Sequence, residues 1–326
     1  MALTLHGTVA DNTVVLSRQN AEPFIINGDF VVAQRGTSAD GTSAYLIDRW
    51  KKQSATTGNV AVSQDTDAPT GFINSQKMLA SGASSFFQTG QQIEYKNFYP
   101  LLGKTASLSF YYKSDVDVII RIRTGTGTVD SVVLFTSSVA STATVSPSAD
   151  WVQYVHNFSV ATNVTSLSIE FATGTLANTD FVFLAGVQLE QGTFDTNSIA
   201  PFQHESFGDN LLRCQRYFQI QASGASGSGY ANGSFRTNAN AQITHHFKTD
   251  MRTSPTCTQI AGSNMIVHDT ADGNNITVTS IDSVLFNSVG GVIIAYNLSG
   301  TSASAGDGCW LYNTGSTPGV TFNSEL

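Results

Sequence analysis

The chain has 326 residues and a formal net charge of −8 at pH 7, and charged residues make up 12% of it, about half the usual share. Lys and Arg number 16 against 24 Asp and Glu. No basic excess is therefore present to replace counterions on a phosphate backbone, and we expect no nucleic-acid partner. The 41% of hydrophobic residues excludes a disordered chain, and the length allows two domains with separate cores.

Three scattered cysteines without C-x-x-C spacing predict isolated, mostly buried thiols rather than a disulfide framework or a zinc ribbon. No apolar run approaches ~18 residues, so we expect no membrane insertion. The first residues have neither a basic nor an apolar segment, so we expect no secretory signal peptide.

Residues 1–24 are predicted to form an N-terminal docking arm. Apolar side chains alternate with polar ones on both sides of a turn at Asp11 and Asn12, namely Leu3, Leu5, Val14 and Leu16. Such a segment can form a hairpin or add a strand to a neighbouring protein. A disordered tail is the alternative.

Residues 25–205 read as a succession of short strands in which apolar and polar side chains alternate. The strands are expected around Leu108–Lys113, Val116–Arg123, Val132–Phe135, Val152–Phe158, Leu167–Phe171 and Phe181–Glu190. In the last strand, one face is expected to hold Phe181, Phe183, Ala185, Val187 and Leu189. Turn residues between the strands, and the absence of a long amphipathic helix, predict a β-sandwich.

Residues 206–220 predict a short helical connector with Asp209 as its N-cap. Residues 221–326 then predict a second, smaller antiparallel β domain, which we call the C-terminal knob. Its strands are expected near Gln242–Lys248, Thr256–Ile260, Ile276–Val278, Val292–Tyr296 and Trp310–Tyr312.

Several strings resemble segments of bacteriophage fibre, spike and head-decoration proteins. They are N-G-D-F-x-x-x-Q-R-G-T-S at 27–38, D-R-W at 48–50, V-Q-L-E-x-G at 187–192, A-P-F at 200–202 and S-F-G-D-N-L-x-x-C-Q-R-Y at 206–217. The resemblance implies that the first domain is a jelly roll of the carbohydrate-binding-module type. It also implies a location on the surface of a virion and assembly as a homotrimer.

The same resemblance implies a possible structural calcium ion, and no other cofactor is expected. Oxygens from Asp29 with Asp180 or Glu190 could bind such a hard cation. Without the resemblance, the residues around Asp29 predict only a turn.

Candidate glycan contacts are Tyr111, Tyr95 and Trp151, because an aromatic face suits the C–H surface of a pyranose. Tyr111 stands out because its neighbours Phe110 and Tyr112 are expected on the opposite face of their strand. The alternative is that these rings pack in a core or a subunit interface. Trp50 is expected to be structural.

Catalytic chemistry has little support in the sequence. His245 and His246 are adjacent on a predicted strand, so they point to opposite faces and cannot bind one metal ion together. No G-x-S-x-G element is present. Two carboxyl pairs are spaced to share a strand face, Asp65 with Asp67 and Asp115 with Asp117. Solvated carboxylates explain them better than a glycosidase pair.

The resemblance, together with the weak support for catalysis, implies a non-enzymatic bacteriophage virion protein, displayed externally as a spike or tail fibre that attaches to host surface glycans. The docking arm would bind other virion proteins of the capsid or tail. One alternative is a capsid head-decoration protein, and another is a polysaccharide depolymerase.

Overall fold

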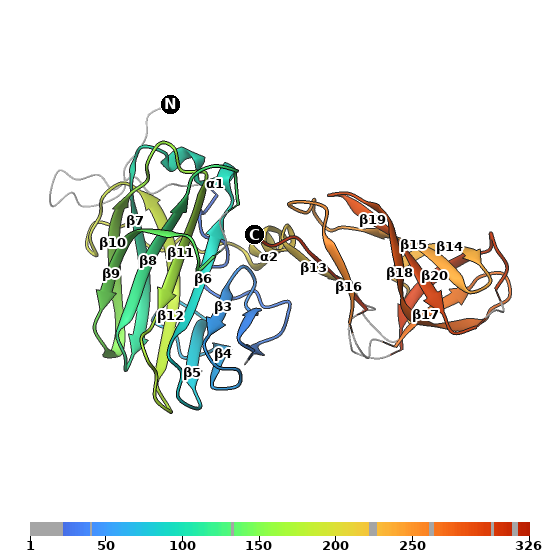
Figure 1. Cartoon of the computed structure of the whole chain (residues 1–326), viewed down its shortest axis with the longest axis horizontal. Helices are drawn as coiled ribbons and strands as arrows, with labels where there is room; N and C mark the ends of the chain where they lie inside the picture. Colours follow the sequence, from blue (N-terminus) through green and yellow to red (C-terminus); the bar gives the residue numbers. More distant parts are fainter. Residues whose placement is uncertain are drawn as a thin grey trace. The chain divides into compact units, whose positions relative to one another are not determined.

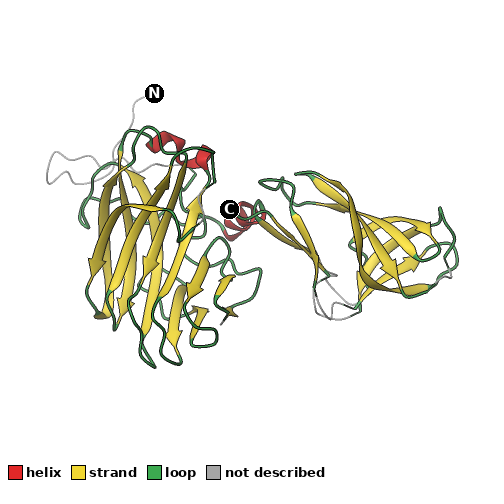
Figure 2. Cartoon of the chain, in the orientation of Figure 1, coloured by secondary structure: helices red, strands yellow, loops and turns green. Residues whose placement is uncertain are grey.

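The computed structural model describes residues 22–39, 41–131, 134–221, 227–260, 264–300, 303–314 and 319–326. The chain divides into two compact units, residues 1–205 and 206–326, and strands dominate both (Figures 1 and 2). Within the described residues, no helix is long and apolar enough to span a membrane. The predicted arm residues Leu3, Leu5, Val14 and Leu16 lie outside the described residues.

The first unit is a sandwich of two six-stranded antiparallel sheets. The β12 sheet contains, in spatial order, β1 (Ser38–Ala39), β4 (Val60–Asp65), β5 (Ser75–Ala80), β12 (Phe181–Gln191), β7 (Thr105–Ser114) and β10 (Ser148–Ser159). The β11 sheet contains β2 (Ser43–Tyr45), β3 (Lys51–Ser54), β6 (Phe87–Ile93), β11 (Ser166–Ala172), β8 (Val118–Gly125) and β9 (Ser138–Val145). Strands far apart in sequence are neighbours in each sheet, as in a jelly roll, which confirms the predicted fold class.

The strands form because their apolar side chains recur at every second residue and meet between the two sheets. On β7, Phe110 and Tyr112 are buried while Tyr111 is half-buried on the outer face, as predicted. The predicted strand at Val132–Phe135 is wrong in its described part, because residues 134–135 lie in a turn and Phe135 has a φ of 79°.

A β-bulge in β12 reverses which side chains face the core. The register shifts between Ala185 and Gln188, at Gly186, whose φ of +57° suits glycine. Side chains 182 and 184 reach the core before the bulge, and 187 and 189 reach it afterwards. The prediction that the five odd-numbered apolar residues share one face is therefore wrong, and Phe183 lies on the outer face.

The N-G-D-F and D-R-W strings are structural. The side chain of Asn27 bonds the carbonyl oxygens of Val32 and Asp48 at 2.8 and 3.0 Å. Trp50 is only 1% exposed, and its Nε1 donates to the carbonyl oxygen of Asn27 at 2.9 Å. Trp50 is therefore the structural residue that the sequence predicted.

Short helices occur in both units. The first unit contains α1 (Tyr95–Phe98) and a 3-10 turn, η1 (Tyr99–Leu101). The second unit begins with α2 (Phe207–Gln215), whose N-cap is Ser206, because the Ser206 hydroxyl accepts from the amide of Asp209 at 3.1 Å. Asp209 is thus the third helical residue, as in a capping box, and its prediction as the N-cap is wrong.

The second unit is built around a closed six-stranded antiparallel barrel. Its strands, in spatial order, are β14 (Ala231–Thr237), β15 (Asn240–His246), β19 (Gly291–Leu298), β18 (Asn275–Asn287), β17 (Met265–Asp269) and β20 (Gly308–Asn313). A separate sheet contains β13 (Phe218–Gln221), β21 (Val320–Asn323) and β16 (Thr256–Gln259). Closure leaves the barrel without free strand edges, and its interior holds an apolar core of its own.

Candidate functional site

The outer face of the β12 sheet carries a group of aromatic rings. We call it the aromatic face and define it by Phe72, Tyr111, Trp151, Phe181 and Phe183. The ring of Phe183 lies 5.6 Å from that of Phe181 and 6.0 Å from that of Trp151. Phe181 and Phe183 lie on the outer face because side chains 182 and 184 of β12 reach the core, and neighbouring side chains leave Phe183 only 6% exposed.

Cations and carboxylates surround the ring of Phe183. The ammonium groups of Lys77 and Lys113 lie 5.2 and 5.1 Å from its centroid, within the range of a cation–π contact. Lys77 pairs with Asp65 at 3.2 Å, and Lys113 pairs with Asp67 at 2.5 Å. The face therefore offers charged hydrogen-bonding groups beside apolar rings.

Trp151 is held in place by its own hydrogen bond. Its Nε1 donates to Oδ1 of Asp67 at 3.0 Å, while Lys113 binds the other carboxylate oxygen. The hydrogen bonds from Lys113 and Trp151 hold the pKa of Asp67 below its ordinary value. Asp67 is therefore ionised at neutral pH and keeps the indole in one orientation.

Tyr111 extends the aromatic face toward the segment after β12. Its ring lies 5.5 Å from that of Phe72, which contacts Phe202 at 5.2 Å and His204 at 5.0 Å. A Cβ at Gly186 would collide with the ring of Phe72. The glycine therefore allows Phe72 and Tyr111 to lie against the sheet.

Two of the three predicted glycan contacts lie on this face. Tyr111 pairs with Gln153 across β7 and β10. The ring of Trp151 lies 6.0 Å from that of Phe183, and its Nε1 binds the carboxylate of Asp67, which Lys113, two residues after Tyr111 on β7, also binds. Tyr95 begins α1 after a strand of the other sheet, and its ring packs against those of Phe98 and Tyr99 at 5.3 and 5.7 Å. Tyr111 and Trp151 thus lie on the same face of the β12 sheet, whereas Tyr95 follows a strand of the other sheet.

The residues predicted for calcium do not all meet. Asp180 precedes β12 and Glu190 lies near its far end, so about 30 Å of extended chain separates them. Asp180 accepts a bond from the amide of Ala177 at 2.7 Å. The buried Asp29 has its Oδ2 3.9 Å from Nδ1 of His204. Asp180 and Glu190 therefore cannot bind one ion together, and calcium in this unit stays a prediction.

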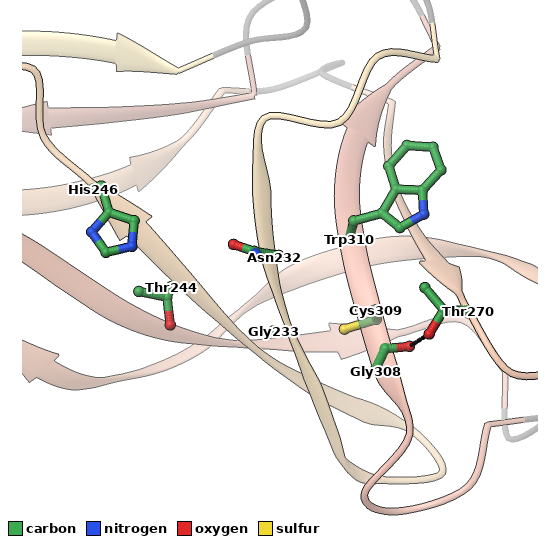
Figure 3. A pocket seen from close by; sticks show the side chains of 8 residues that line it. All are labelled: Asn232, Gly233, Thr244, His246, Thr270, Gly308, Cys309 and Trp310. Atoms are coloured by element: carbon green, nitrogen blue, oxygen red, sulfur yellow. Dashed lines mark hydrogen bonds between the residues drawn. The ribbon is translucent and has the colours of Figure 1, made fainter.

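The barrel of the second unit carries a surface groove of about 690 Å³. Asn232 pairs with both Thr244 and Trp310, so the three share the outer face of the barrel. The ring of Trp310 lies 4.9 Å from those of His268 and Tyr312. The lining residues, drawn in Figure 3, are Asn232, Gly233, Thr244, His246, Thr270, Gly308, Cys309 and Trp310.

Sequence reasoning missed this groove, because β14 and β20 come from distant parts of the chain. The alternation of Trp310 with the buried Cys309 and Leu311 was the only available signal. The prediction for the adjacent histidines is confirmed: His245 is buried while His246 is exposed and lines the groove.

No family model and no curated protein matches this chain. Among solved structures, the enzymatically active domain of a bacteriophage CBA120 tailspike protein is 14% identical with a TM-score of 0.38; the match covers 52% of this chain and 21% of that one. A CBM4 structure is 17% identical with a TM-score of 0.34, covering 51% and 98%. TmCBM61 in complex with β-1,4-galactotriose is 11% identical with a TM-score of 0.35, covering 53% and 100%.

Proposed function

We propose that this protein is a non-enzymatic glycan-binding protein and that the aromatic face of the first unit binds the sugar. One observation carries the proposal: Tyr111 and Trp151 lie on one outward surface, where Trp151 and Lys113, two residues after Tyr111 on β7, bind the same carboxylate of Asp67. Both are half-buried, so each side chain is supported by the protein and still partly exposed to solvent. Aromatic faces in this arrangement suit the C–H surfaces of pyranose rings.

The polar groups at the same place suit the hydroxyls of a sugar. Asp67 accepts hydrogen bonds and Lys113 donates them, while the amide of Gln153 is positioned by its bond to Ser109 at 3.0 Å. Because the indole is already fixed by Asp67, little side-chain entropy is lost on binding. We therefore expect recognition of a neutral or weakly charged glycan, with weak affinity at each site.

The test is a glycan array probed with the full chain, followed by calorimetric titration of the best ligand. Trp151→Ala and Tyr111→Ala should each weaken binding at least about tenfold, the loss expected from one ring contact and its hydrogen bonds. Tyr99→Ala is the control, because Tyr99 is 60% exposed and lies in η1. Wild-type affinity in both face variants, with unchanged circular dichroism, would refute the assignment.

We further propose that the protein is displayed on a bacteriophage particle as a homotrimeric spike or fibre, attached through residues 1–24. The sequence strings that resemble phage fibre and decoration proteins support this, and several copies would strengthen weak single-site binding. Light scattering of the full chain and of a chain without residues 1–24 tests the assembly. A monomer in both forms would contradict the trimer.

The two alternatives give different results in simple assays. Labelled antibody on intact particles would decorate the capsid if the chain were a head-decoration protein, and the tail if it were a spike or fibre. Incubation of the purified chain with host capsule or lipopolysaccharide tests for a depolymerase. Shortened polysaccharide chains would contradict the non-enzymatic proposal.

A further inference from the structure

Three carboxylates meet at one end of the barrel in the second unit. Asp269 ends β17, Asp272 lies in the turn between β17 and β18, and Asp307 directly precedes β20. One carboxylate oxygen from each lies within 4.8 Å of one from each of the others. The cluster therefore joins two loops that are separate in sequence.

Asp269 supplies a buried oxygen that has no hydrogen-bond partner. The residue is 0% exposed, and its Oδ1 accepts bonds from the amides of Ala271 and Asp272 at 2.9 and 3.4 Å. Its Oδ2 is buried and, within the described residues, receives no hydrogen bond. A buried carboxylate oxygen without a donor is unfavourable unless a cation binds it.

Basic side chains do not neutralise the cluster. Among the described residues, no ion pair joins Lys, Arg or His to any of the three carboxylates. Like charges this close repel one another, most strongly where one of them is buried.

We propose that Asp269, Asp272 and Asp307 bind a divalent cation, and that the cation is calcium. Carboxylate oxygens are the ligands that hard cations prefer, and calcium accepts the irregular geometry that two loops provide, whereas magnesium requires a near-ideal octahedron. The loops are already positioned, because the amide and hydroxyl of Thr270 both donate to the carbonyl oxygen of Gly308, at 3.0 and 2.7 Å. Little ordering is therefore needed before the ion binds.

Calcium at this site would stabilise one wall of the barrel groove. Thr270 and Gly308 line the groove (Figure 3), and each is adjacent in sequence to a residue of the cluster. The bound ion would link the β17–β18 turn to the loop before β20. This site goes beyond the proposed glycan binding, which concerns the first unit. Neither proposal depends on the other.

The experiment is a titration of the EDTA-treated full chain with CaCl₂ and, separately, MgCl₂, up to about 10 mM, well above the dissociation constants of weak extracellular calcium sites. Calorimetry should detect calcium binding that is at least tenfold tighter than magnesium binding. At a tenfold excess of calcium over the dissociation constant, the Tm of the second unit should rise by roughly 5 °C.

Asp272→Asn and Asp307→Asn are the informative variants, because both residues lie at least partly at the surface and their replacement should not prevent folding. Each should weaken calcium binding at least tenfold and abolish most of the Tm shift. Asp282→Asn, at an exposed position in β18, should bind as the wild type does. The proposal would be overturned if calorimetry detected no heat of calcium binding, or if magnesium bound as tightly as calcium. Full calcium binding in both Asp272→Asn and Asp307→Asn would also overturn it.

Discussion

Nε1 of Trp151 and Oδ1 of Asp67 are joined by a hydrogen bond of 3.0 Å, although 84 positions separate the two residues in sequence. Lys113 binds the same carboxylate at 2.5 Å. Asp67, in the turn after β4, thus connects β10 with β7 on the outer face. The orientation of the indole therefore depends on the ionisation of one exposed carboxylate.

This dependence predicts a loss of stability in acid. The folded-state pKa of Asp67 is lowered from its ordinary value of 3.8, so its contribution is present above the pKa of the unfolded chain and is lost as pH falls through the folded-state pKa. Because Asp67 is 42% exposed, we expect its ionised carboxylate to contribute less than about 1 kcal/mol to the free energy of unfolding. Denaturant unfolding of wild type and Asp67→Asn at pH 7 and pH 3 measures it.

The variant should be less stable at pH 7 and should lose less on acidification than the wild type. Asp150→Asn, at another exposed aspartate of the same unit, should follow the wild-type curve. Equal acid sensitivity of wild type and Asp67→Asn would show that this carboxylate contributes nothing.

Gly186→Ala should damage the aromatic face. A non-glycine residue at a φ of +57° costs about 1–2 kcal/mol, and the new methyl group would collide with the ring of Phe72 and displace it from Tyr111. We expect lower stability and weaker glycan binding, measured by chemical denaturation and titration. Gly174→Ala is the matched control, because its Cβ would meet nothing within 4 Å. Unchanged glycan affinity in Gly186→Ala would mean that the position of Tyr111 does not matter for glycan binding.

The second unit should become less stable between pH 6.5 and pH 3 because of His245. Burial, and then the charge of His246, lowers its pKa from 6.5 to about 3. Nδ1–H donates to Oε1 of Gln221 at 2.7 Å, and the hydroxyl of Tyr296 donates to Nε2 at 3.0 Å, which suits the neutral ring. In this window the unfolded chain binds a proton that the folded chain does not. The free energy of unfolding therefore falls by up to about 1.4 kcal/mol for each pH unit of acidification.

Scanning calorimetry of the full chain at several pH values checks this. His245→Gln should lower the Tm of the second unit at pH 7 and flatten its dependence on pH. His246→Gln changes an exposed neighbour and should keep the steep dependence. An equally steep curve for His245→Gln would assign the acid sensitivity to other groups.

Glu170 should be among the most costly single charges to remove. It is fully buried in β11, and its carboxylate binds Arg121 and Arg123 of β8, each at 2.5 Å. Glu170→Ala would leave two partly buried guanidinium groups without their anion. We expect this to lower the free energy of unfolding by about 3–5 kcal/mol. Lys96→Ala, which breaks a pair whose lysine is 56% exposed, should cost less than about 1 kcal/mol. Urea unfolding compares the two, and similar losses would contradict the argument.

Local patterns predicted much of this molecule. Alternation predicted that Tyr111 and Phe110 point to opposite faces of β7, and that His245 and His246 point to opposite faces of β15. Both follow because consecutive side chains on a strand point to opposite sides. The true cap at Ser206 was also readable, since S-F-G-D has the spacing of a capping box. Asp209 alone also fits an N-cap, and only the serine three positions before it distinguishes N-cap from third helical residue.

The sequence by itself determined the all-β class, the separate sandwich and C-terminal β region, and the side of a strand that each residue faces where the period is unbroken. Only the tertiary structure decided the rest. The bulge at Gly186 depends on how β12 pairs with β7, and it changes the core-facing side chains of β12 from 182 and 184 to 187 and 189. Barrel closure brings Asn232 beside Trp310, and Asp269 beside Asp307. The reason is physical: the period of a strand is local, whereas register, bulges and closure arise from pairing between residues far apart in the chain.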